Sequence, residues 1–363
     1  MIRRFYVHNF RCLDNFELPI SGRSSTLLIG NNGSGKSTVA LALGVLQSIG
    51  RGINVIADLI RPSDFSSGQD LPMRFEIEVE LKKGLFQYII AFEIPRATGD
   101  LRLREERLSL DGEPVYSRDF AAAGKGLIKG FQVSWQLIAL PVVDFGIEGD
   151  AITIFRRWLA RLLILRPIPS LISGDSSGVT LEPRSDGSDF GGWFAGLLQE
   201  VPAAYNKIEE QLKRVMPDFH DIRNSRDGRD VRGLAMQFSS DTGTVLIPFR
   251  DLSDGEKCFA ICSVVLAMNQ FLGPVVCFWD ESDNYLAVSE VGHFVMDLRR
   301  CFEAGGQFIA TSHNPEAILT FSDENTLVVF RRSHLEPTQL RPLSEIKFSG
   351  DLATALVRGY IEP

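Results

Sequence analysis

The chain of 363 residues is 44% hydrophobic and 23% charged, which is typical of a globular protein with an apolar core and unlike a disordered chain. Its formal net charge of −8 at pH 7 argues against broad, sequence-independent attraction to polyphosphate, so any nucleic-acid surface must be local. No apolar run approaches the ~20 residues that span a bilayer, and the first residues lack the core of a signal peptide. We therefore expect a cytoplasmic protein without membrane contact.

A glycine-rich run, Gly30–Thr38, is the first motif that carries chemistry, and it meets every position of the pattern G-x-x-x-x-G-K-[ST]. It lies between Ser25–Ile29, which is typical of a short buried strand, and Thr38–Leu46, which is typical of a helix. Glycines at such a turn let backbone N–H groups close around phosphate oxygens, and the helix N-terminus adds partial positive charge. The residues expected to bind a nucleoside triphosphate are Asn31, Asn32, Gly33, Ser34, Gly35, Lys36, Ser37 and Thr38.

Two side chains of this loop have specific expected roles. Lys36 is expected to reach the β- and γ-phosphates, and the Ser37 hydroxyl is expected to ligate Mg²⁺.

Further along the chain, Met73–Leu81 alternates between apolar and polar residues, and Gln87–Ile94 continues the pattern after a short turn. Because Leu101–Leu110 extends it again, we predict an antiparallel β subdomain.

The middle of the chain is expected to be mainly helical, over about residues 151–172 and 190–217. A loop-like stretch then carries four arginines spaced by three, interleaved with aspartates. This stretch is either a solvated loop with internally paired charges, which we favour, or a local phosphate track for DNA. Its arginines are Arg223, Arg226, Arg229 and Arg232, and its aspartates are Asp221, Asp227 and Asp230.

A capping pattern precedes the long apolar helix expected over Cys258–Leu272, because Ser253 is followed three residues later by Glu256. As a helix cap, this pattern needs no function. The Ser253 hydroxyl and the backbone N–H of Gly255 could equally form a second phosphate-binding surface at the helix N-terminus.

Two later strands are expected to present polar residues beside the phosphate loop. The apolar run Val275–Trp279 ends in Asp280 and Glu281, which we assign as a Mg²⁺ ligand and as the general base or water-orienting residue. A second apolar run places His313 just past its end, where an imidazole can hydrogen-bond the γ-phosphate or the attacking water. The alternatives are a solvated acidic turn and a structural or solvated histidine.

The motifs in this order resemble the ATP-binding cassette (ABC) class of ATPases, specifically its DNA-maintenance branch of RecF-like, SMC-like and OLD-type heads. Val7–Leu13 is similar to the N-terminal strand motif of that branch. The resemblance implies a P-loop NTPase fold of class α/β, with a mixed central sheet, an antiparallel β subdomain and a helical insert. It also implies ATP, Mg²⁺ and a homodimer, in which Ser253 and Gly255 contact the γ-phosphate bound to the opposing protomer.

On this basis we divide the chain into an N-terminal ATPase lobe (1–145), a helical insert or lid (146–233) and a C-terminal ATPase lobe (234–363). Asp254 replaces the usual glycine of the signature motif, and Ser282–Val288 differs from the usual sequence after the catalytic glutamate. The glutamine that senses Mg²⁺ and the γ-phosphate in this class is assigned to Gln136 in preference to Gln87.

The chain is expected to be a compact head. No sustained heptad repeat lies between Lys36 and Ser253, and about fifty residues follow His313, too few for the C-terminal nuclease domain of larger OLD-type proteins. The leading hypothesis is an ATP-gated dimeric ATPase in DNA maintenance or antiphage defence, acting on DNA or with a separate effector such as a nuclease. The alternative is a regulatory module whose ATP occupancy holds a partner protein inactive, without direct action on DNA.

Overall fold

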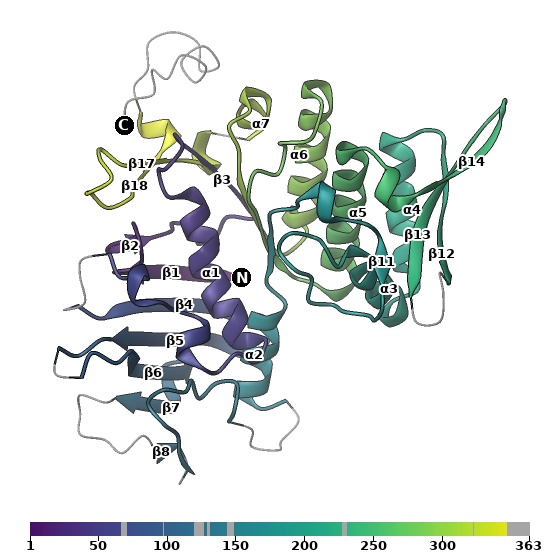
Figure 1. Ribbon diagram of the computed structural model, residues 1–363. Helices are drawn as coiled ribbons and strands as arrows, with labels where there is room; N and C mark the ends of the chain where they lie inside the picture. The colour runs from purple at the N-terminus through teal and green to yellow at the C-terminus, as the bar shows by residue number, and fades with distance from the viewer. Residues whose placement is uncertain are drawn as a thin grey trace.

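The structure is a computed structural model that describes residues 1–66, 71–96, 98–119, 127–128, 131–143, 149–226, 231–321 and 323–346. Figure 1 shows an antiparallel sheet on one side of the molecule and a group of helices with a smaller sheet on the other. A central sheet joins the two sides. Within the described ranges, no helix combines the length and the apolar character needed to cross a membrane.

The central sheet is mixed, as expected. Five of its strands, in the order β10-β15-β16-β3-β17, are parallel, and β18 is antiparallel to β17 at one edge. Strands buried on both faces are expected to be continuous apolar runs, and β3 and β16 are buried at every residue. The strands are β10 (Leu163–Leu165), β15 (Val276–Trp279), β16 (Gln307–Thr311), β3 (Ser25–Ile29), β17 (Thr326–Phe330) and β18 (Gln339–Pro342).

Each face of the central sheet belongs to a different hydrophobic core. Along β3, Leu27 and Ile29 point into one core, which also contains apolar residues of the helical side. Leu28, between them, points into the other core, which α1 and the antiparallel sheet share. The helices are α1 (Lys36–Gly50), α2 (Ala151–Ala160), α3 (Phe190–Glu200), α4 (Ala204–Val215), α5 (Asp254–Leu272), α6 (Val288–Glu303) and α7 (Pro315–Thr320).

The predicted β subdomain is confirmed as a sheet in the order β2-β1-β4-β5-β6-β7. The expected hairpin pairs Met73 with Phe92 and Leu81 with Gly84, and α1 lies against this sheet in Figure 1. The strands are β1 (Ile2–His8), β2 (Phe16–Glu17), β4 (Met73–Leu81), β5 (Gly84–Glu93), β6 (Arg102–Leu110) and β7 (Glu113–Asp119).

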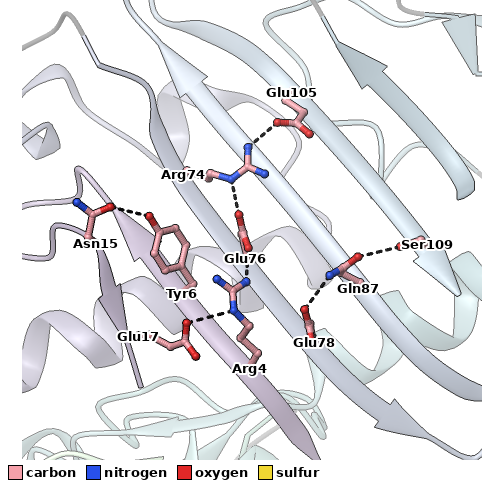
Figure 2. Close-up of polar contacts among 10 residues, drawn as sticks. All are labelled: Arg4, Tyr6, Asn15, Glu17, Arg74, Glu76, Glu78, Gln87, Glu105 and Ser109. Atoms are coloured by element: carbon pink, nitrogen blue, oxygen red, sulfur yellow. Dashed lines mark hydrogen bonds and ion pairs between the residues drawn. The ribbon is translucent and has the colours of Figure 1, made fainter. Parts of the chain in front are cut away.

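One face of this sheet carries paired charges (Figure 2). Arg74 contacts Glu76 and Glu105, each at 2.5 Å, and Arg4 contacts Glu76 and, at 3.2 Å, Glu17. Each of these arginines therefore lies between two carboxylates. The pairs neutralise positive charge that a phosphate track would need.

The helix expected over residues 151–172 is shorter than predicted. Only Ala151–Ala160 is α-helical, Leu163–Leu165 forms β10 in the central sheet, and Pro169–Leu171 is a short 3-10 helix. A short buried strand and a helix segment have similar apolar composition, while Pro167 and Pro169 prevent the helix from continuing. The stretch of about residues 190–217 was expected to be helical, and α3 and α4 confirm this.

The arginine stretch is not the loop that we expected. Arg223 and Arg226 lie on β12 (Phe219–Arg226), and Arg232 begins β13 (Arg232–Ser240), which pairs with β12. Leu234, Met236 and Phe238 alternate on β13 and are buried. This strand is central in the small sheet, and the charged segment on β12 pairs with it. Arg229, Asp227 and Asp230 lie outside the described residues. The small sheet also contains β11 (Asp175–Ser176) and β14 (Gly243–Pro248).

Candidate nucleotide and metal site

The phosphate loop connects β3 to α1, in the strand–loop–helix context that the sequence predicts. Gly30 has a φ of 146°, and a Cβ atom there would lie 2.0 Å from the carbonyl oxygen of Val329 on β17. Only glycine fits that contact. Gly35, which caps α1, has a φ of 112°, so the backbone turns in a conformation that other residues rarely adopt.

Lys36 lies inside this loop and is only 6% exposed. Its Nζ donates hydrogen bonds to the carbonyl oxygens of Gly30 at 2.6 Å and Asn31 at 3.2 Å. Burial lowers the pKa of the Lys36 ammonium, while the charges of Asp280 and Glu281 act in the opposite direction. The ammonium therefore lies at the centre of the loop, within electrostatic reach of both acids.

The two predicted acids follow β15 and are held by the neighbouring strand β16. Thr311 donates a 2.7 Å hydrogen bond from its hydroxyl to Oδ1 of Asp280. The same hydroxyl oxygen accepts a 2.7 Å bond from the backbone N–H of Glu281. Asp280, whose side chain is 3% exposed, also donates its backbone N–H to Leu165 on β10. Thr311 thus orients both acids at once.

Glu281 departs from the strand direction of β15. Its φ is 55°, in the left-handed region that a residue with a side chain rarely occupies. Its Oε2 accepts a 2.6 Å hydrogen bond from the side-chain amide of Asn284. The backbone turn separates the two carboxylates, so that Asp280 stays buried while Glu281 is half-buried.

His313 follows β16 and belongs to the same electrostatic site. Partial burial lowers the pKa of its imidazole, and the charge of Lys36 lowers it further, while Glu281 and Asp280 oppose the shift. The charges of the loop lysine and of both acids therefore act on the histidine, whose side chain is exposed beyond the end of β16. The neutral imidazole is favoured, which suits a hydrogen-bonding role at neutral pH.

Ser253 and Gly255 lie elsewhere, at the N-terminus of α5. The Ser253 hydroxyl accepts a 3.3 Å bond from the N–H of Glu256, whose carboxylate accepts a 2.7 Å bond from the N–H of Ser253, so the predicted capping box is present. Among the described residues, no hydrogen bond joins Ser253 or Gly255 to the phosphate loop of the same chain. Ser253 is exposed, as a contact across a dimer would require.

A cavity of about 380 Å³ opens beside the loop, and its lining includes Ser37 and Asp280. A hydroxyl and a carboxylate are oxygen ligands of the kind that Mg²⁺ prefers. In the loop itself, the buried Ser34 Oγ has no hydrogen-bond partner among the described residues. These features fit a magnesium–triphosphate ligand.

Neither candidate sensor glutamine lies at this cavity. Gln87 is on β5 and donates to Glu78 at 2.7 Å on the charged face of the β subdomain (Figure 2). Gln136 is exposed, and its backbone carbonyl oxygen accepts a hydrogen bond from the backbone N–H of Ile56 at 3.3 Å. In the part of the chain that the structure describes, no hydrogen bond or ion pair joins either glutamine to Ser37 or Asp280.

Sequence reasoning missed Thr311, Asn284 and Arg166, the last of which lies beside Asp280. The position of Thr311 at the end of an apolar strand, like that of Asp280, was the one available signal. Its contact with the acids depends on which strands are neighbours, and strand order is not visible in the sequence.

Comparison with known proteins supports the same fold. The family described as "AAA domain, putative AbiEii toxin, Type IV TA system" matches residues 25–319, which include every site residue named above. No curated protein sequence matches the chain. One similar solved structure is an Smc head bound to the C-terminal winged-helix domain of ScpA, with a TM-score of 0.58, 16% identity, and coverage of 95% of this chain and 99% of that chain.

Another similar structure is an Smc head domain with an extended coiled coil, bound to the C-terminal domain of ScpA derived from Pyrococcus furiosus. It has a TM-score of 0.57 and 12% identity, and the match covers 99% of both chains. The expected fold class is thus confirmed. The expected compactness is confirmed for the described residues, because the longest helix between Lys36 and Ser253 is α1, with 15 residues.

Proposed function

Since the chain belongs to this AAA-domain family and is an ATPase with an ABC-type head, we propose that it works as an ATP-gated dimer. The observation that carries the proposal is the separation of two half-sites. Lys36 lies within electrostatic reach of Asp280 and Glu281, whereas no hydrogen bond or ion pair among the described residues joins the N-terminus of α5 to the phosphate loop of its own chain. A second copy can complete each site by bringing Ser253 and Gly255 to the γ-phosphate.

In the proposed reaction, water attacks the γ-phosphorus, the bond to the β–γ bridging oxygen breaks, and ADP and inorganic phosphate leave. Glu281 orients the water and accepts its proton, and Asn284 and Thr311 hold Glu281 in place. Lys36 binds the β- and γ-phosphates. Bound Mg²⁺ would neutralise charge on the phosphate oxygens, held by Ser37 and Asp280.

We further propose that closure of the dimer controls an action in DNA maintenance or antiphage defence, together with a separate effector such as a nuclease. The family description, which names a toxin–antitoxin system, supports a defence role. The fold likeness to Smc heads, which were solved bound to ScpA, supports a protein partner. The net charge of −8 limits any direct contact with DNA to a local basic surface.

The alternative is a regulatory module in which ATP occupancy holds a partner inactive without direct action on DNA. The paired charges on the face shown in Figure 2 favour it, because they leave less positive charge for phosphates there.

The test compares the wild type with Glu281→Gln by light scattering, with and without ATP and Mg²⁺. The proposal predicts a dimer that requires ATP and persists in Glu281→Gln, because slow hydrolysis keeps the bound state populated. An unchanged mass in both proteins would contradict ATP-gated dimerisation. Stimulation of turnover by DNA would favour the leading process, whereas tight ATP retention in a stable complex with a pulled-down partner would favour the regulatory module.

A further inference from the structure

Arg166 lies beside Asp280 because their strands are parallel neighbours. Leu165, the last residue of β10, pairs with Trp279, the last residue of β15. The residues that follow are held in register, since the N–H of Asp280 donates to the carbonyl oxygen of Leu165 at 2.7 Å. Arg166 itself donates its N–H to Ser185 at 2.7 Å. The backbone therefore fixes an arginine at the same sheet edge as the predicted metal ligand.

The side chain of Arg166 faces the free oxygen of Asp280. Its Nε lies 3.8 Å from Oδ2, whereas Oδ1 is already bonded to Thr311. The arginine side chain is 60% exposed and the aspartate side chain is 3% exposed. An ion pair with one partner this exposed is weak, because water screens it. The guanidinium can therefore leave Asp280 at a small cost in free energy.

The cavity beside the phosphate loop gives the Arg166 guanidinium room to move away from Asp280. Arg166, Asp280 and Ser37 all line it. Ser37 and Asp280 are the expected metal ligands, and Mg²⁺ held by them would neutralise charge on the phosphate oxygens. Asp280 and Glu281 both lie within electrostatic reach of Lys36, the residue expected to bind the β- and γ-phosphates. A cation next to Asp280 is therefore at the end of the site where the terminal phosphate is expected.

A second arginine lines the same cavity but is held more firmly. Arg11 donates from Nε to Oδ1 of Asp64 at 2.9 Å, and its backbone N–H also donates to the carbonyl oxygen of Asp64. Arg166 has the longer contact and the more exposed side chain of the two. It is the cation of this cavity that is better placed to move to a ligand.

We propose that Arg166 is a recognition residue for the γ-phosphate, which moves from Asp280 to the terminal phosphate when the magnesium–triphosphate enters. The inference rests on the proposed ATP site. The guanidinium presents several N–H donors in a planar arrangement that suits phosphate oxygens. Its release of Asp280 frees Oδ2 for the metal. One side chain thereby links triphosphate recognition to completion of the metal site and distinguishes ATP from ADP.

The test measures the dissociation constants of ATP and ADP, both with Mg²⁺, for Arg166→Ala in the Glu281→Gln background. The expected loss is about 10- to 100-fold for ATP, the range for one charge-assisted hydrogen bond. ADP affinity is expected to stay within about threefold, because ADP lacks the γ-phosphate. Arg166→Lys is expected to retain part of the discrimination, since it keeps the charge but loses the planar donors.

The matched control is Arg161→Ala, because Arg161 is exposed and lies at the other end of β10. It is expected to leave both dissociation constants unchanged. Equal weakening of ATP and ADP by Arg166→Ala, or no weakening of either, would overturn the inference while leaving the ATP site intact. Tighter ATP binding would also overturn it, because Arg166 would then merely compete with the metal for Asp280. Failure of the Arg166-containing parent to bind ATP would overturn the proposed function as well.

Discussion

Thr311 donates a 2.7 Å hydrogen bond to Oδ1 of Asp280, so the end of one strand orients the carboxylate that follows its neighbour. Groups that hold a metal ligand in this way affect metal affinity although they do not touch the metal. The threonine hydroxyl therefore deserves a direct test, independent of the acids themselves.

We expect Thr311→Val to lower ATP turnover by about 10- to 100-fold, because Asp280 loses its orienting partner. The protein is also expected to melt at a lower temperature, since the buried carboxylate and the N–H of Glu281 lose one hydrogen bond each. Thr311→Ser keeps the hydroxyl and serves as the matched control. Steady-state turnover and thermal melting check the pair, and equal turnover in both variants would contradict the assigned role.

Glu281→Gln is expected to retain ATP binding and to lower turnover by about 10²-fold or more, because the amide cannot accept the proton of the attacking water. Phosphate release and nucleotide binding are measured on the same preparation. Lys36→Ala shows how much activity comes from a contaminating ATPase. Turnover at the wild-type rate in Glu281→Gln, with an inactive Lys36→Ala, would show that Glu281 has no catalytic role.

The pH dependence of stability and of turnover is expected to show the titration of His313. Its pKa is lowered from the ordinary 6.5 by partial burial and by the charge of Lys36. The folded protein therefore resists protonation that the unfolded chain accepts, so the stability of the wild type relative to His313→Gln is expected to fall as the pH falls below 6.5. Turnover should likewise lose its acid limb in this variant. An acid limb that is unchanged in His313→Gln belongs to another group.

Ser253 has two possible roles, which substitutions can separate. Ser253→Asp preserves a helix cap, whereas Ser253→Ala removes it at a cost of about 1 kcal/mol of stability. Ser253→Arg is expected to weaken the ATP-dependent dimer of Glu281→Gln by its bulk at the subunit contact. Analytical ultracentrifugation with ATP and Mg²⁺ measures the dimer. If Ser253→Arg and Ser253→Asp dimerise as well as the parent, Ser253 is a cap and nothing more.

The four arginines of the predicted phosphate track test direct DNA binding. Arg226 and Arg232 lie directly opposite each other, and no described carboxylate lies within ion-pair distance of either. Replacing Arg223, Arg226, Arg229 and Arg232 by glutamate is expected to abolish DNA binding and its salt dependence while basal hydrolysis persists.

Fluorescence anisotropy at several salt concentrations measures this DNA affinity. Reversal of Lys213 and Arg214 on α4, which pair with Glu209 and Glu210, adds half as much negative charge and is the control for charge reversal elsewhere on the surface. A wild type that binds no DNA at low salt, with ATP present and the dimer formed, would favour the regulatory module.

The sequence predicted those elements whose pattern lies within a few neighbouring residues. The strand Ser25–Ile29 has the predicted bounds, because five apolar or small residues before a phosphate loop leave few alternatives. The short strand Leu163–Leu165 was mistaken for helix, since its apolar run lies close to α2 and carries no turn signal. It also lies within the proposed insert, 146–233, whose boundaries stay a prediction.

The site residues that the sequence did not predict reach the site through the order of the strands. Arg166 and Thr311 reach Asp280 only because β10 and β16 flank β15, and no spacing along the chain encodes that adjacency. The proposed contacts of Ser253 and Gly255 depend on a second copy of the chain, which a single sequence shows even less directly. The motif residues were therefore predictable, whereas their supporting partners were not.

The alternation of Leu27, Leu28 and Ile29 between two cores has a mechanical consequence. A strand whose side chains pack into a core on each face cannot shift relative to one core without straining the other, because close-packed interiors have low compressibility. The phosphate loop begins where this strand ends. A shift of the loop on nucleotide entry would consequently act on both cores at once, and the two sides of the protein would respond together.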